Sequence, residues 1–146
     1  MAVVTRSVLL SHPAERMFEL VADVASYPSF LPWCGGAVVR ESTPSSVVAT
    51  LTIAFKGLRQ SFTTRNDNVP GRSIQMTLID GPFSVLTGEW VFTPLSSEAC
   101  RVDFQLDYRF SSLLLEKVVG SVFDPIAKSF VDAFVRRADE LHGTAS

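Results

Sequence analysis

The chain has 146 residues, 47% of them hydrophobic, and a formal net charge of −2. This length is enough for one domain with a sizeable core, so we expect a single domain over residues 1–146. The small negative charge excludes capture of nucleic acid by a globally basic surface. The two cysteines, Cys34 and Cys100, are too few for a disulfide scaffold and are expected to be reduced thiols. Neither a secretory signal nor an apolar run of about 18 residues is found, which predicts a cytoplasmic protein.

The N-terminal part of the chain predicts a strand, a helix and a rigid aromatic segment. Residues 2–10 are rich in β-branched residues, as is typical of a strand. Pro13 stands where a helix can begin without a backbone N–H, and Pro28 ends that helix near residue 25. Residues 27–34 hold two prolines and three aromatic residues, which favour a short helical turn or a crossing segment. This aromatic–proline segment either plugs the end of the core or lines a ligand cavity, and the pattern leaves both roles open.

Further strands are expected between residues 37 and 110, separated by turn residues such as Gly, Pro, Asp and Ser. Their expected ranges are 37–42, 47–55, 59–66, 73–79, 84–92 and 100–110. In the last range apolar residues alternate with charged or polar ones from Cys100 to Phe110. Such alternation is typical of an antiparallel sheet with one face in water.

Residues 111–142 predict one long amphipathic helix. Its phenylalanines and neighbouring aliphatic residues fall on one broad face at 100° per residue, and its charged residues fall on the other. Ser111 or Ser112 suits the N-cap and Gly143 suits the terminator. Pro125 removes one helical hydrogen bond and predicts a bend nearby. The expected fold class is therefore α+β, with about seven antiparallel strands curved around a long C-terminal helix and short N-terminal helices.

Patterns of catalytic residues are absent from the sequence. His12 and His142 are the two histidines, and neither is expected to act as a catalytic base or a metal ligand. No nucleophile elbow, zinc-protease motif or glycine-rich phosphate loop occurs. Glu116 is expected at the edge of the apolar face of the long C-terminal helix. If a carboxylate enters a cavity, Glu116 is therefore the candidate. The sequence predicts a protein that is not an enzyme and that requires no cofactor or metal.

Several segments together carry a resemblance to a known family. They are Tyr27-Pro28-Ser29-Phe30-Leu31-Pro32-Trp33-Cys34, Phe62-Thr63-Thr64-Arg65-Asn66, Leu78-Ile79-Asp80-Gly81-Pro82-Phe83, Trp90-Val91-Phe92-Thr93-Pro94-Leu95, Phe104-Gln105-Leu106-Asp107-Tyr108 and Ala133-Phe134-Val135-Arg136-Arg137-Ala138. Through them the chain resembles the coenzyme Q-binding START-domain family, which includes the RatA-like ribosome-association toxins. This family lies in the START-like superfamily, also called SRPBCC or polyketide cyclase-like. The resemblance covers nearly the whole chain and implies the helix-grip fold.

The resemblance implies two functions of different classes. The first is non-catalytic binding of a hydrophobic ligand, ubiquinone or a similar polyprenyl quinone, in support of cellular respiration. The second is a toxin that binds the large ribosomal subunit and blocks subunit association, which inhibits translation. The motifs are shared by both branches and do not choose between them. A bilayer offers the quinone nearly the same apolar environment as a cavity. Head-group hydrogen bonds or transient contact with the inner membrane surface would therefore have to favour its transfer to the protein. Neither function involves DNA.

Each function has its own candidate residues. A ligand cavity between helix and sheet would be lined by Tyr27, Phe30, Trp33, Met76, Phe83, Trp90, Phe123, Ile126 and Phe130, for each of which ordinary core packing is the alternative. The hydroxyl of Tyr27 and the indole N–H of Trp33 are the expected donors to a ligand head group. The candidate ribosomal contacts are Lys56, Arg59, Arg65 and Arg72. They are expected to form one basic cluster around neighbouring hairpins, diluted by Asp67, and a solvated sheet face is the alternative.

Overall fold

The computed structural model describes residues 2–143, which form a seven-stranded sheet, three α-helices and one 3-10 helix. In chain order the elements are β1 (Ala2–Leu10), α1 (Ala14–Ala22), the 3-10 helix η1 (Val24–Ser29), β2 (Cys34–Thr43), β3 (Ser46–Phe55), β4 (Leu58–Val69), β5 (Ser73–Asp80), β6 (Phe83–Ser96), β7 (Ala99–Phe110), α2 (Leu113–Val118) and α3 (Gly120–His142). None of the helices in this range is long and apolar enough to cross a membrane.

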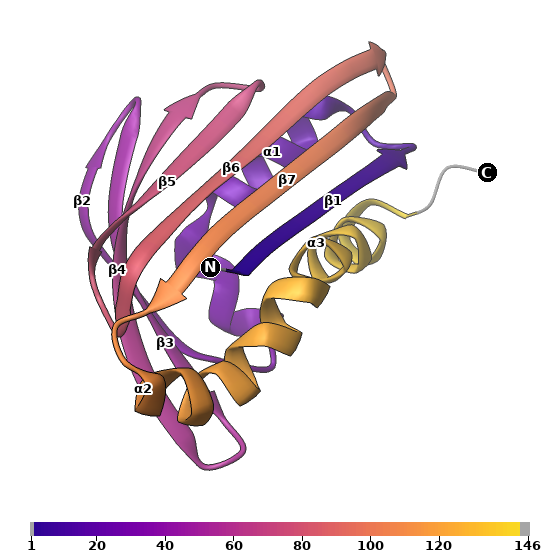
Figure 1. Ribbon diagram of the computed structural model, residues 1–146. Coiled ribbons are helices and arrows are strands. Elements are labelled where there is room, and N and C mark those ends of the chain that lie inside the picture. The colour runs from indigo at the N-terminus through magenta and orange to yellow at the C-terminus, as the bar shows by residue number, and fades with distance from the viewer. Residues whose placement is uncertain (1, 144–146) are drawn as a thin grey trace.

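The sheet is an open meander from β2 to β7, and the first strand, β1, pairs with β7 at one edge. Its strand order is β1-β7-β6-β5-β4-β3-β2, and each neighbouring pair is antiparallel. Figure 1 shows the sheet curving around α3, with α1 behind β6 and β7. The predicted α+β class, with a curved antiparallel sheet around a long C-terminal helix, is confirmed.

Strand β7 shows how the sequence pattern produces the core. Successive side chains of a strand point to opposite faces of the sheet, so alternate residues share one environment. The apolar set is buried and comprises Cys100, Val102, Phe104, Leu106 and Tyr108. The intervening residues are exposed or half-buried, as the alternation predicted. One face of the sheet is therefore dry, and α3 and α1 cover it.

The C-terminal helix differs from its prediction in one respect. It is not uninterrupted from residue 111 to 142, because α2 ends at Val118 and α3 begins at Gly120. Gly120 is buried against Phe110, and a Cβ there would stand 3.2 Å from the Phe110 ring. Pro125, the expected cause of a bend, lies inside α3 and does not end it. The predicted caps are present, since the Ser112 side chain accepts a hydrogen bond from the Leu115 N–H and Gly143 follows the last helical residue.

The turn between β5 and β6 allows the packing of Gly81 against Phe62 to be tested. Gly81 has φ = +152°, and a Cβ on it would stand 2.7 Å from the Phe62 Cβ. We expect Gly81→Ala to lower the free energy of unfolding by about 2 kcal/mol, because backbone strain and the clash add. Chemical denaturation measures this loss.

Gly71→Ala is the matched control. Gly71 also has a positive φ of +73°, but nothing lies within 4 Å of its Cβ position. Only backbone strain is then expected, about 1 kcal/mol. Equal losses in the two variants would contradict the importance of the contact with Phe62.

Candidate functional site

An internal cavity lies between the inner face of the sheet and α3. Its volume is about 60 Å³, and its wall is mostly apolar. This is enough for more than one water molecule, each of which needs roughly 10–15 Å³. It is far below the roughly 300–1,000 Å³ of pockets that hold drug-sized ligands. A ligand with a ring and a long tail can therefore enter only if neighbouring side chains move.

Most of the predicted lining residues meet at this cavity. The residues in its wall are Tyr27, Trp33, Met76, Phe123, Ile126 and Phe130. The other predicted residues, Phe30, Phe83 and Trp90, pack elsewhere in the core against Phe134, Phe110 and Phe104. The aromatic–proline segment thus plays both of the roles left open by its sequence, since Tyr27 and Trp33 form cavity wall while Leu31 is buried core.

Tyr27 does not serve as the free donor that the sequence suggested. Its hydroxyl donates a hydrogen bond to the backbone carbonyl of Val21, at an O···O distance of 2.5 Å. Burial raises the pKa of Tyr27 far above its ordinary value, and the nearby Asp23 and Cys34 raise it further. The tyrosine proton is therefore held within the protein and is not available to a ligand head group.

Two polar side chains in the cavity wall were missed by the sequence analysis. Thr64 and Asn66 are only 6% and 7% exposed, and the Thr64 hydroxyl donates to the Asn66 side-chain oxygen at 3.1 Å. The signal was present in the alternation of β4, which places Phe62, Thr64 and Asn66 on one face. They are the polar part of an otherwise apolar wall.

A groove on the surface lies against the same wall. Its volume is about 240 Å³, and it runs between the segment after η1, the β3–β4 turn and one side of α3. Trp33 and Ile126 line both the groove and the cavity. These two side chains therefore separate the cavity from the surface.

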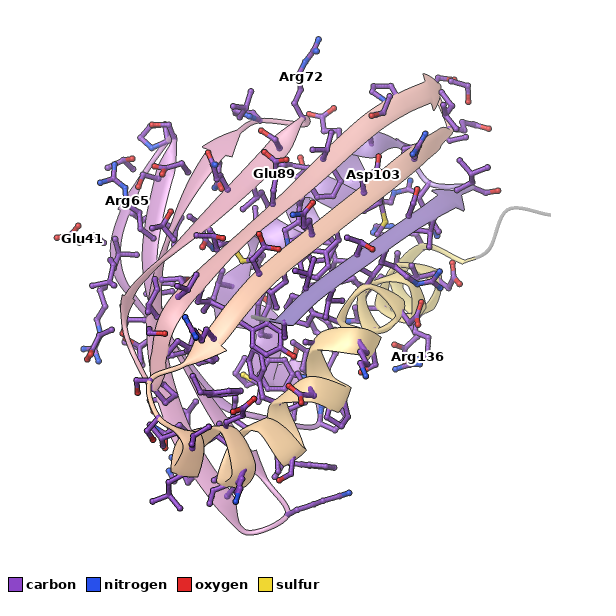
Figure 2. All side chains as sticks on the ribbon, in the orientation of Figure 1. Glu41, Arg65, Arg72, Glu89, Asp103 and Arg136 are labelled. Carbon is purple, nitrogen blue, oxygen red and sulfur yellow. The ribbon has the colours of Figure 1, made fainter. Side chains whose placement is uncertain are left out.

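The four basic residues predicted to contact the ribosome do not form one cluster. Lys56 lies in the turn before β4 and Arg59 near the start of that strand, whereas Arg65 lies further along it and Arg72 in the turn after it. From Arg59 to Val69 the strand makes ten residue steps, roughly 33 Å at about 3.3 Å per residue, and Arg72 follows in a turn whose N–H donates to the Val69 carbonyl. The β3–β4 turn lies at the bottom of Figure 1, and Figure 2 shows Arg65 and Arg72 toward the opposite end. The expectation of a single cluster is wrong, because β4 is long.

One of the basic residues near β4 is paired with an acidic neighbour. Within the described residues, Arg65 pairs with Asp67 at 3.2 Å, whereas Lys56, Arg59, Arg72 and Arg136 form no ion pair. Lys56 and Arg136 line the same groove, which brings positive charge from the β3–β4 turn and from α3 to one end of the molecule. We call Lys56, Arg59 and Arg136 the basic end.

Lys56 occupies an unfavourable backbone conformation. It has φ = +51° and is followed by Gly57 with φ = +80°, in a two-residue turn that joins the paired residues Phe55 and Leu58. Asparagine, aspartate or glycine is preferred at the first position of such a turn, because a side chain in this region costs about 1–2 kcal/mol. A lysine at the tip despite this cost suggests a role for its charge.

The histidines and Glu116 lie away from the cavity. His12 and His142, although near opposite ends of the chain, have ring centroids 6.4 Å apart. His12 is buried and shares a hydrogen bond of 2.7 Å with Asp139, which joins the start of α1 to the end of α3. Glu116 was the candidate for a carboxylate that enters the cavity, but it is exposed on α2 and is not part of the cavity wall. In residues 2–143, no group of three His, Cys, Asp or Glu residues is placed to hold a metal ion.

Both tyrosines of the chain should resist ionisation in the folded state. Burial raises the pKa of Tyr108, and the hydrogen bond that it donates to the Asp124 carboxylate at 2.6 Å raises it further. Burial also raises the pKa of Tyr27. Since both folded pKa values exceed the ordinary 10.0, the stability from these protons is complete below pH 10 and falls as the pH rises above it.

We expect tyrosinate absorbance of the folded protein to appear only together with the loss of its circular dichroism. Protein unfolded in urea is the reference and should titrate near pH 10. Tyrosinate formation near pH 10 with the fold intact would contradict the burial of both hydroxyls.

Comparisons with known proteins agree with this architecture. The family described as polyketide cyclase / dehydrase and lipid transport matches residues 10–135. The structure of the Zhui aromatase/cyclase from Streptomyces sp. R1128 superimposes with a TM-score of 0.82, covering 94% of this chain and 93% of that one. The two sequences are 19% identical, so this likeness shows a shared fold and carries no conclusion about catalysis.

Two relatives extend over most of this chain. The ribosome association toxin RatA of Vibrio cholerae is 46% identical over 143 residues, which cover 98% of this chain and 99% of the relative. The mitochondrial coenzyme Q-binding protein COQ10 homolog B of Xenopus laevis is 29% identical over 143 residues, covering 95% of this chain and 59% of the relative. The chain belongs to the polyketide cyclase / dehydrase and lipid transport family, within the START-like superfamily that its sequence resembles.

Proposed function

We propose that this protein is a ribosome-association toxin that acts in the cytoplasm, where it binds the large ribosomal subunit, blocks subunit association and so inhibits translation. The observation that carries the proposal is the 46% identity to the RatA of Vibrio cholerae over nearly the full length of both chains. The relative that binds coenzyme Q is less similar, at 29% identity. The comparison therefore favours the ribosome over the quinone as the first function.

The basic end is the surface that we assign to the ribosome. A protein with a net charge of −2 needs a local cationic site to bind an RNA polyanion, because its overall field is not attractive. Lys56, Arg59 and Arg136 offer three uncompensated charges, whereas at the other end of β4 Arg72 offers one, because Arg65 pairs with Asp67. Figure 2 shows Arg136 projecting outward from α3, where it can reach a large flat partner.

Sedimentation of purified ribosomal subunits tests the proposal. We expect the protein to sediment with the large subunit and to lower the yield of joined ribosomes when the small subunit is added. The small subunit alone is the control and should not carry the protein down. If the protein sediments with neither subunit and leaves joining unchanged, the proposal is wrong.

Substitutions at the two ends of β4 locate the contact. Lys56→Asn with Arg59→Gln should weaken binding to the large subunit and reduce the slope of log K against log salt by about two, roughly one per lost phosphate contact. The folding stability should be kept, because asparagine tolerates the left-handed conformation at position 56.

The matched control is Arg65→Gln with Arg72→Gln, which removes the same number of charges at the other end. We expect this variant to bind with nearly the original salt dependence. If only the control variant lost binding to the large subunit, the ribosomal contact would lie away from the basic end.

A second function is supported by the cavity itself. We infer that the protein also binds a hydrophobic molecule, such as a polyprenyl quinone, without transforming it. Moving an apolar ligand from water to this apolar wall is favourable by about 25 cal/mol per Å² of apolar surface buried. The groove beyond Trp33 and Ile126, with the 40%-exposed Phe55 and the cation of Lys56 beside it, suits transient contact with an anionic membrane surface.

Gly88 allows the cavity to be narrowed from the sheet side. A Cβ at Gly88 would stand 2.3 Å from the terminal methyl of Met76, so Gly88→Ala must displace this methionine from its place in the cavity wall. In a fluorescence titration, we expect the variant to bind a short-tailed ubiquinone several-fold more weakly than the original protein. This corresponds to a loss of about 1 kcal/mol in binding free energy.

Gly36→Ala is the control for this test. Gly36 lies on β2 with its Cβ position 4.0 Å from the nearest atom, and it is not part of the cavity wall. The quinone affinity of the Gly36→Ala variant should equal that of the original protein. Equal affinities for the Gly88→Ala variant and the original protein, or no saturable binding by the original protein, would contradict ligand binding in the cavity.

A further inference from the structure

The inner face of β4 changes from apolar to polar within the core. Phe62 is followed on the same face by Thr64, Asn66 and Asn68. The cross-strand neighbours of Asn66 are apolar, Val47 on β3 and Met76 on β5. The polar side chains therefore stand alone in an apolar surrounding, where each needs a hydrogen-bond partner to offset its lost hydration.

The hydrogen bonds of these side chains are incomplete. The Thr64 hydroxyl donates to the Asn66 side-chain oxygen, which uses the proton of Thr64 and one lone pair of Asn66. Within residues 2–143, no further hydrogen bond joins the Asn66 side-chain amide, and this side chain is 93% buried in the cavity wall (100 − 7). Its N–H₂ group can therefore donate into the cavity.

The sizes of the two hollows indicate how a ligand would be divided between them. The cavity of about 60 Å³ is compact, whereas the groove beyond Trp33 and Ile126 measures about 240 Å³. A small ring in a slightly widened cavity would lie against Asn66. A flexible apolar tail would then extend past Trp33 into the groove.

We propose that Asn66 recognises a carbonyl oxygen on a compact apolar ring, and that Thr64 positions the Asn66 amide for this contact. The inference rests on the apolar-ligand function proposed above and adds the chemical group that the cavity selects. A site whose buried donor needs an acceptor discriminates against a molecule of the same shape that lacks one, because the donor is then left unpaired.

Duroquinone and durene are the probes that test this selection. Both carry four methyl groups on a six-membered ring, and only duroquinone has carbonyl oxygens. Its methyl groups also leave no free ring position for addition of the thiols of Cys34 and Cys100. We expect the original protein to bind duroquinone about tenfold more tightly than durene in calorimetry, as for one added hydrogen bond. The Asn66 side-chain amide resonances should shift on saturation with duroquinone.

Asn66→Leu keeps the approximate size of the side chain and removes the donor. We expect this variant to lose the preference for duroquinone and to bind durene at least as well. Its stability is measured beside its affinity and should fall by about 1–3 kcal/mol, because the buried Thr64 hydroxyl loses its acceptor. Thr64→Val should lower the preference by about threefold, since it acts only through the orientation of Asn66. Asn68→Leu is the matched control on the same strand face, outside the cavity wall, and should keep the full preference.

The outcomes separate this inference from the function on which it rests. If the original protein binds both probes equally, or if Asn66→Leu retains the preference, carbonyl recognition by Asn66 is wrong while the apolar-ligand function stands. An unchanged Asn66 amide resonance at saturation also overturns it. If the original protein binds neither probe nor a short-tailed ubiquinone, the apolar-ligand function fails as well.

Discussion

The packing of the aromatic face of α3 against the sheet is the interaction on which the rest of the structure depends. Phe134 is fully buried and makes edge-to-face contacts with Tyr27 and Trp90, and Phe130 packs against the same Trp90 and against Phe104. Burial of each ring contributes about 2–3 kcal/mol, and each aromatic pair adds about 0.5–1.5 kcal/mol. These contacts hold η1, α3 and the central strands together. Rigid rings cannot fill every space between a curved sheet and a helix, and the cavity lies beside them.

The polar and charged groups are divided between the inside and one end of the molecule. Asn66 and Thr64 line the cavity, whereas Lys56 and Arg136 line the surface groove and Arg59 lies near the start of β4. A ligand contact and an RNA contact can therefore exist on one chain without sharing residues. They remain neighbours in space, because the groove that carries Lys56 and Arg136 also borders the cavity through Trp33 and Ile126.

Much of the fold could be predicted because it follows from local periodicity. The alternation from Cys100 to Phe110 has the period of a strand with one dry face, and the helical face carrying Phe123, Phe130 and Phe134 has the period of a helix on that sheet. The division of the C-terminal helix could not be predicted in the same way. It occurs where Gly120 meets Phe110, a contact that no local pattern contains.

The site was only partly predictable for the same physical reason. Aromatic residues such as Tyr27 and Trp33 could be placed near a cavity from composition, but the hydrogen bond that occupies the Tyr27 hydroxyl depends on how η1 folds back on Val21. Asn66 was overlooked although the parity of its strand places it inside. The basic residues were grouped by their closeness in sequence, yet a strand of 12 residues carries them to opposite ends of the molecule.

Hydrogen exchange of the protein, free and bound to the large ribosomal subunit, tests the central claim most directly. If the basic end is the ribosomal contact, backbone amides of residues 55–59 should exchange more slowly in the complex, and those around Arg72 should be unchanged. Protection around Arg72 alone, or no protection anywhere at saturating subunit, would contradict the claim.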